Sequence, residues 1–298
     1  MNAQTSPKPK RRFGDRYDGY RLRNVDPIYQ LVPVIMRSRL DSQVLYDDYV
    51  DIAELERFVN AQRAGGLPGL RTIHVILAAL LRVISQKPRI NRFIAGKKLY
   101  ARSEVRFSMA VKRAWNEDAE STEILPEFEL DDTLSDVVAK TEKAISGIKS
   151  DDAPTDTDFV AKIFSFCPTF LKSFAVFAVR SLDKVGLMPR VIHKASPFHS
   201  SVFITDVGSL GVPPVYHHLY EFGTTSAFLS VGKKDVFPQA LAEGEVVGRR
   251  MLHLRYVIDE RICDGYYFAS AIKLMNKLLK NPQVLLKKPE LVIREKTR

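Results

Sequence analysis

The chain has 298 residues, of which 45% are hydrophobic and 27% charged, and its formal net charge is +10. A chain of this length and composition folds around a sizeable core, and its two cysteines, Cys167 and Cys263, argue against a disulfide scaffold or a cysteine-based zinc site. The positive charge favours an anionic substrate, a membrane surface or a nucleic acid. Because the sequence contains no nucleic-acid-binding motif of interleaved basic and aromatic residues, we expect no nucleic-acid partner.

The N-terminus is polar and basic. Residues 1–20 lack an apolar run, so we predict a flexible basic arm there and a single domain over residues 21–298. The same absence of an apolar run argues against a signal peptide, and the expected location is the cytoplasm.

The first half of the chain alternates between β-rich and helical patterns. Thr72–Gln86 is the clearest helix, because its apolar residues recur with helical spacing until Pro88 ends it. By similar reasoning we predict strands over Val44–Ile52, Leu99–Val111 and Thr122–Leu130, and helices over Ala53–Ala64 and Thr133–Ile148.

The segment Phe159–Leu182 is rich in Phe, Val, Ala and Leu. Lys162, Pro168, Lys172 and Arg180 interrupt it, whereas a spanning helix needs about 20 consecutive apolar residues with few charges. We predict amphipathic helices, broken near Pro168, that pack on the protein. The alternative is docking on a membrane surface or on a partner.

The second half begins with a β-rich run. We predict strands over Ser201–Thr205, Ala227–Val231 and Met251–Ile258, followed by a helix over Tyr267–Leu279. Strands mixed with helices, without strict alternation, indicate an α/β sandwich with a mixed sheet.

Residues Asp259–Gly265 read D-E-R-I-C-D-G. This segment resembles the D-H-R-x-x-D-G motif of the dihydrolipoamide acyltransferases, the core subunits of 2-oxo acid dehydrogenase complexes. Its C-D-G also matches the related chloramphenicol acetyltransferases. The run Phe203–Gly208 and the helix ending at Pro88 and Asn91 fall where that family has further motifs, so the resemblance extends over about residues 30–290.

The resemblance implies a chloramphenicol acetyltransferase-like two-layer sandwich with a mixed sheet. It also implies a homotrimer with active sites between subunits, and transfer of an acyl group between coenzyme A and a thiol or other acceptor. The implied substrates are a small-molecule acyl donor and acceptor, with no metal. Because lipoyl and subunit-binding domains are not found in the sequence, we expect a stand-alone member without a covalent lipoyl group.

The resemblance also assigns the site residues. The family's catalytic His falls on Glu260, and its oxyanion-stabilising Ser falls on Thr205. Asp264 is expected to orient the turn through an Arg, for which Arg37 and Arg39 are the candidates. Arg261 and Gly265 are expected to shape the same turn, and His217 or His218 is a possible alternative base.

Glutamate is a weak base for this chemistry. A free Glu titrates near ~4.3 and a thiol near ~8.5, so proton transfer is uphill by roughly 5–6 kcal/mol, part of which burial of the Glu could recover. Two hypotheses therefore stay open. The first is an acyltransferase that uses Glu260 as a weakened base, and the second is a catalytically impaired oligomeric scaffold or coenzyme A-binding protein.

Overall fold

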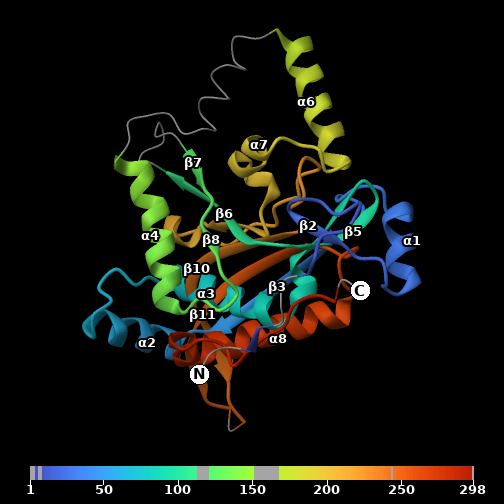
Figure 1. The fold of residues 1–298 in the computed structure, drawn as a ribbon. Helices are drawn as coiled ribbons and strands as arrows, with labels where there is room; N and C mark the ends of the chain where they lie inside the picture. The colour runs from blue at the N-terminus through green and yellow to red at the C-terminus, as the bar shows by residue number, and fades with distance from the viewer. Residues whose placement is uncertain (1–3, 6–8, 113–120, 151–167, 243, 297–298) are drawn as a thin grey trace.

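A seven-stranded mixed sheet forms the centre of the fold in the computed structural model, which describes residues 4–5, 9–112, 121–150, 168–242 and 244–296 (Figure 1). The strand order is β3-β11-β10-β9-β6-β7, with β8 paired to β6. The strands are β3 (Gln43–Asp51), β6 (Val105–Lys112), β7 (Ser121–Ile124), β8 (Glu127–Phe128), β9 (Val202–Asp206), β10 (Ala227–Ala240) and β11 (Val246–Asp259).

The sheet is mixed because β9 runs parallel to both of its neighbours, whereas β10, β11 and β3 are antiparallel. Helices cover one face of it: α2 (Ala53–Ala64), α3 (Thr72–Gln86), α4 (Leu134–Ser150) and α8 (Gly265–Lys280) share the main hydrophobic core with the sheet. This arrangement confirms the predicted two-layer sandwich with a mixed sheet.

The opposite face of the sheet, called the outer face below, has no helical layer in the described residues. Phe203, Phe228 and Val257 form a small core there with Leu219, which comes from the loop between β9 and β10. Since side chains alternate along a strand, Thr205 lies on the same face as Phe203. The loop therefore passes over the face that carries Thr205.

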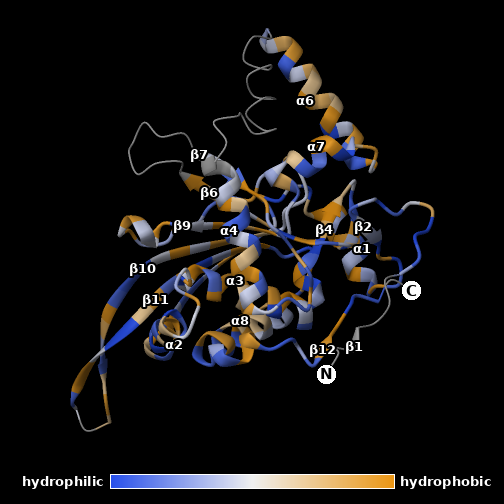
Figure 2. Ribbon diagram, turned by 60° about the vertical axis from the view of Figure 1, so that its left-hand side comes forward, coloured by the Kyte–Doolittle hydropathy of each residue, from blue (hydrophilic) through white to orange (hydrophobic). Residues whose placement is uncertain are grey.

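The helices predicted over Ala53–Ala64 and Thr72–Gln86 have the bounds of α2 and α3. The β10–β11 hairpin is longer than predicted, and its outer half projects from the body (Figure 2). Residues 234–240 are exposed on both faces of the hairpin. The alternation of buried and exposed side chains that marks a half-buried strand is therefore missing there.

Two predicted strands are each divided. Leu99–Val111 contains β5 (Lys98–Arg102), which pairs with β4 (Arg92–Ala95) and β2 (Gly19–Arg21) in a separate sheet, and then β6. Thr122–Leu130 contains β7 and β8. Ser103 and Glu104 lie at the first break and Pro126 at the second, but these residues do not show with which strand each half pairs.

The remaining described elements connect these layers. They are β1 (Gln4–Thr5), α1 (Pro27–Ile35), α6 (Thr169–Lys184), α7 (Arg190–Ala195), β12 (Leu291–Val292) and the short 3₁₀ segments η1 (Pro88–Asn91), η2 (Pro197–His199), η3 (Gly208–Leu210) and η4 (Pro282–Leu286).

Part of the predicted basic arm contributes to the interior. Arg16 and Asp18 are buried, and Arg16 pairs with Asp18 at 2.8 Å and with Asp183 at 2.7 Å. His193 Nε2 lies 3.3 Å from the other Asp18 oxygen. The fold therefore begins before residue 21, because these charges need one another as partners once they are buried.

The predicted break near Pro168 coincides with the start of α6, while residues 159–167 of that segment lie outside the described residues. Within the described part of the chain, none of the helices has the length and apolar character needed to cross a bilayer.

Candidate functional site

The turn after β11 is held by a buried ion pair. Asp259 is fully buried and accepts hydrogen bonds from Arg261 Nε at 2.8 Å and Nη2 at 2.7 Å. Ser42 Oγ donates to the same carboxylate at 3.0 Å, and Arg261 Nη1 donates to the carbonyl of Met36 at 3.0 Å. Arg261 thus shapes the turn, and it does so through Asp259.

Glu260 lies between Asp259 and Arg261 in sequence, but its side chain takes no part in their ion pair. Its backbone N–H donates to the carbonyl of Ser42 at 2.9 Å, while its side chain is partly exposed. Within the described residues, no ion pair or side-chain hydrogen bond involves its carboxylate. The Asp259–Arg261 pair therefore fixes the backbone of Glu260 and leaves its carboxylate available.

Asp264 caps the helix that follows. It accepts from the N–H of Tyr267 at 2.8 Å and from the hydroxyl of Tyr29 at 2.9 Å. The hydrogen bond from the backbone N–H of Tyr267 is the main reason that the pKa of Asp264 is lowered. The nearest guanidinium is that of Arg89, 3.9 Å away.

The expected partners of Asp264 are elsewhere. Arg37 is exposed, and Arg39 is buried and donates to the carbonyls of Tyr220, Glu221 and Ile94. The expectation that either would orient Asp264 is corrected: α1 places Tyr29 at Asp264, and the chain after α1 turns Arg39 toward the β9–β10 loop.

Gly265 and Cys263 have passive roles in the turn. Gly265 is not among the glycines with positive φ, and a Cβ added there would meet nothing within 4 Å, so this turn does not require glycine. Burial raises the pKa of the Cys263 thiol to about 12. That thiol stays protonated at neutral pH and is unsuited to act as a nucleophile.

Thr205 is far from Glu260 within one chain. Thr205 is the cross-strand partner of Ser230 on β10, and Ser230 is the cross-strand partner of Arg255 on β11. Arg255 lies five residues before Glu260. A strand rise of ~3.3 Å per residue and a strand spacing of ~4.8 Å then separate Thr205 and Glu260 by on the order of 20 Å. A single chain does not bring them together.

The two adjacent histidines lie on the outer face of the sheet. The ring of His217 is stacked on Phe228, with centroids 4.6 Å apart, and its Nδ1 lies 2.8 Å from the carbonyl oxygen of His218. The next residue, Leu219, donates to Gln43, which is level with Asp259. The loop thus passes near the turn, but no described contact joins either histidine to Glu260.

The structure adds Glu123, which the sequence did not single out. Its carboxylate accepts from Ser108 Oγ at 3.3 Å, and Ser108 is level with Phe203, two residues before Thr205. Burial raises the pKa of Glu123 to about 7. It is therefore a group on Thr205's side of the sheet that exchanges a proton near neutral pH, and no local sequence signal marks it.

Glu123 leads to a stability prediction. Because its pKa is raised in the folded state, the contribution of Glu123 to stability is greatest below its unfolded pKa and falls as pH rises toward and past about 7. Glu123→Gln should therefore be more stable than wild type at pH 8, by about 1–3 kcal/mol, and equally stable at pH 4.5. Thermal unfolding at both pH values measures this.

The matched control is Glu127→Gln, which changes an exposed carboxylate on the neighbouring β8. It should leave the difference between the two pH values unchanged. A Glu123→Gln variant that is no more stable than wild type at pH 8 would contradict the assignment.

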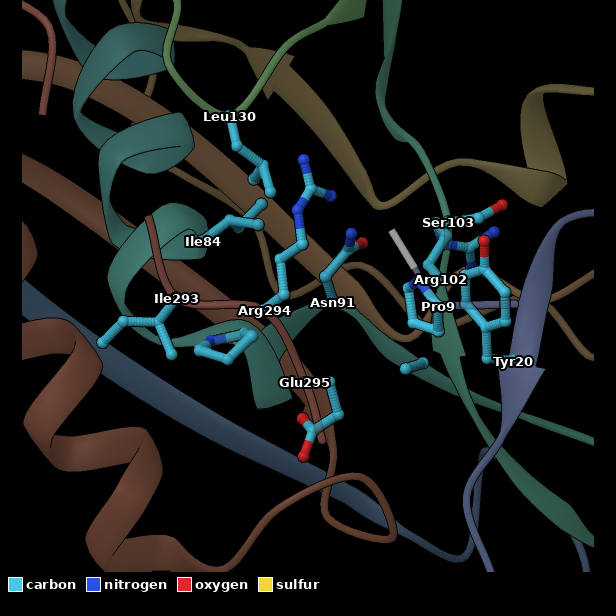
Figure 3. A pocket seen from close by; sticks show the side chains of 12 residues that line it. Pro9, Tyr20, Ile84, Asn91, Arg102, Ser103, Leu130, Ile293, Arg294 and Glu295 are labelled. Atoms are coloured by element: carbon cyan, nitrogen blue, oxygen red, sulfur yellow. The ribbon is translucent and has the colours of Figure 1, made fainter. Parts of the chain in front are cut away.

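A small cavity lies between η1, β5 and the C-terminal residues 293–295 (Figure 3). Asn91 and Arg294 lie between Ile84 and Leu130 on one side and Tyr20, Arg102 and Ser103 on the other. Asn91 Oδ1 and Arg294 Nε are buried without a hydrogen-bond partner. The cavity measures about 50 Å³, which is room for a few water molecules rather than a coenzyme.

No group of three or more His, Cys, Asp or Glu side chains in the described ranges is placed to hold a metal ion.

Comparison with known proteins finds one family model that matches part of the chain. Residues 194–287 match the family model of the 2-oxoacid dehydrogenases acyltransferase (catalytic domain). This range contains Thr205, Glu260 and Asp264. No curated protein matches the chain.

Solved structures resemble the whole chain. A dihydrolipoamide acetyltransferase of Azotobacter vinelandii is 18% identical with a TM-score of 0.55, over 86% of this chain and 91% of that one. The cubic core of the pyruvate dehydrogenase multienzyme complex is also 18% identical, with a TM-score of 0.54 over 95% and 100%. A chloramphenicol acetyltransferase is 13% identical, with a TM-score of 0.50 over 87% and 98%.

The comparisons agree on the fold of the chain. The fold is that of chloramphenicol acetyltransferase-like enzymes and of dihydrolipoamide acyltransferase cores, as the sequence motifs indicated. Over residues 194–287 the chain is in addition similar to the acyltransferase catalytic domain of the 2-oxoacid dehydrogenases.

Proposed function

We propose that this protein transfers acyl groups between coenzyme A and a thiol or other acceptor, with Glu260 as the base and Thr205 as the oxyanion donor. The observation that carries the proposal is the turn itself. A buried Asp259–Arg261 pair fixes Glu260, whose carboxylate has no partner in the described residues.

The spacing of the site supports this assignment. The Azotobacter vinelandii structure was solved to investigate a serine, a histidine and an asparagine in the catalytic mechanism, and that histidine and asparagine are four residues apart. Glu260 and Asp264 are also four residues apart. Thr205 keeps the hydroxyl that a serine would supply.

The proposed reaction begins when the Glu260 carboxylate accepts the proton of the attacking thiol. The thiolate adds to the thioester carbonyl, and the Thr205 hydroxyl donates a hydrogen bond to the resulting oxyanion. The tetrahedral intermediate then expels the other thiolate, which takes the proton back from Glu260. No metal or further cofactor enters this sequence of steps.

We propose that the site lies between subunits of a homotrimer. Two observations support an assembly: Thr205 and Glu260 are too far apart in one chain, and the edge strand β3 exposes Leu45, Tyr46 and Tyr49. The proposed location is the reducing cytoplasm, which suits the free Cys263 thiol.

Release of free coenzyme A from acetyl-CoA in the presence of a dithiol acceptor tests the activity. We expect wild type to catalyse the exchange and Thr205→Ala to lower its rate by about 10²–10³-fold, the usual effect of losing one oxyanion donor. A wild-type protein that is folded and trimeric but releases no coenzyme A would contradict the proposal.

The second candidate function is a non-catalytic oligomeric scaffold or coenzyme A-binding protein. It is favoured by the carboxylate at position 260, since an acidic side chain is a weaker base than an imidazole. Calorimetric binding of coenzyme A to a protein without exchange activity would support this alternative.

A further inference from the structure

Helix α6 exposes an apolar stripe that no other described part of the molecule covers. Phe170, Phe174 and Phe177 follow the spacing i, i+4, i+7 and are 75%, 66% and 67% exposed. Leu171 and Leu182, also exposed, extend the stripe along one side. Figure 1 shows α6 standing away from the sheet, and Figure 2 shows apolar residues along its length.

The base of the helix is firmly attached to the domain. Asp183 pairs with Arg16 at 2.7 Å, and its second oxygen lies 3.3 Å from His199. Gly186, at φ +77°, packs so closely that a Cβ would come within 2.9 Å of Arg16 Cγ. The C-terminal end of α6 is therefore fixed to the domain, and the apolar side chains are exposed on a helix that is held in place.

The anchoring also sets the direction of the stripe. Phe174 lies nine residues before Asp183, which at about 100° per residue places the two on opposite sides of the helix. Asp183 is turned into the protein, so the phenylalanines are turned away from it.

Charge indicates what covers this stripe. Residues 168–195 carry five basic side chains, Lys172, Arg180, Lys184, Arg190 and Lys194, and their one acidic residue, Asp183, is buried. Lys172 and Arg180 lie on the side of α6 turned away from the centre of the stripe, and Lys184 lies beside Phe177 at the edge of the stripe. Two copies of this surface would repel each other, whereas an anionic surface would attract it.

We propose that α6 lies on an anionic lipid bilayer, with the stripe in the interface and the flanking cations at the headgroups. An amphipathic helix with Phe and Leu on one face and Lys and Arg on the other is the usual structure of such an anchor. Long basic side chains reach the headgroups while their stems stay in apolar surroundings. This inference is independent of the acyl-transfer proposal.

Vesicle flotation of the full-length protein tests the proposal. At about 50 mM NaCl we expect the protein to float with phosphatidylcholine vesicles that contain about 30% phosphatidylglycerol, and much less with phosphatidylcholine alone. Phe174→Ser/Phe177→Ser should weaken binding at least about tenfold, because two large apolar side chains no longer enter the interface. Arg180→Glu/Lys184→Glu should weaken it by about tenfold or more and remove the preference for the anionic lipid.

The matched control is Val236→Ser/Val246→Ser, which removes two exposed apolar side chains from the β10–β11 hairpin. It should float as wild type does, and circular dichroism should show that every variant is folded. Two results would overturn the proposal: wild type that does not float with anionic vesicles, or a folded Phe174→Ser/Phe177→Ser variant that floats as well as wild type. A smaller particle mass for that variant in light scattering would also overturn it, by assigning the stripe to contacts between copies.

Discussion

Glu260→Gln is expected to lower the rate of coenzyme A release by about 10²–10⁴-fold, the range for loss of a general base. The amide cannot accept the thiol proton, while its size and hydrogen-bonding geometry are nearly unchanged. The backbone N–H of residue 260 still donates to Ser42, and the Asp259–Arg261 pair does not involve the substituted side chain. The free energy of unfolding should therefore stay close to that of wild type.

Two further variants serve as a control and as a test for a gain in rate. Asp41→Asn removes an exposed carboxylate from the segment before β3 and should leave the rate unchanged. Glu260→His should raise the rate, because an imidazole is better matched to the proton transfer at neutral pH. A Glu260→Gln enzyme with the wild-type rate would move the base elsewhere, with Glu123 and His217 as the next candidates.

Asp259→Asn is expected to cost about 3–5 kcal/mol of folding free energy, the usual cost of removing one partner from a buried ion pair. Arg261 would remain buried without its carboxylate, since Asp259 supplies the acceptors for both its Nε and Nη2. The turn would lose its fixed shape, so activity should fall together with stability. Urea unfolding followed by circular dichroism measures the change.

The surface pair Arg57–Glu54 provides the contrast, because both side chains are mostly exposed. Glu54→Gln should change the free energy of unfolding by less than about 1 kcal/mol. If Asp259→Asn were equally mild, the turn would have to be held by Met36 and Ser42 instead, and the account of how Glu260 is positioned would be wrong.

Sequence patterns specified the core layers well, and for a clear reason. The apolar residues of α3 recur with one uninterrupted helical period until Pro88, and the bounds of that helix followed directly. Exposed or divided elements were harder. The outer half of the β10–β11 hairpin has no buried face. β5 and β6 are separated by only Ser103 and Glu104 although they pair in different sheets.

The site was predictable only as far as its local motif. D-E-R-I-C-D-G located Glu260 and placed Asp259, Arg261 and Asp264 in one turn. It could not show that Asp264 is held by Tyr29, or that Asp259 is the partner of Arg261. Contacts between residues far apart in sequence depend on how the layers pack, and Glu123 acquires its raised pKa only through such burial.

The most direct test of the account is complementation between two impaired chains, Thr205→Ala and Glu260→Gln, carrying different affinity tags and co-expressed. If each site combines Thr205 of one subunit with Glu260 of the next, every mixed trimer has both residues intact in one of its three sites, and we expect about a third of the wild-type rate of coenzyme A release from the doubly purified mixed assembly. Mixed assemblies that are no more active than either parent, in a preparation where wild type is active, would contradict a site shared between subunits.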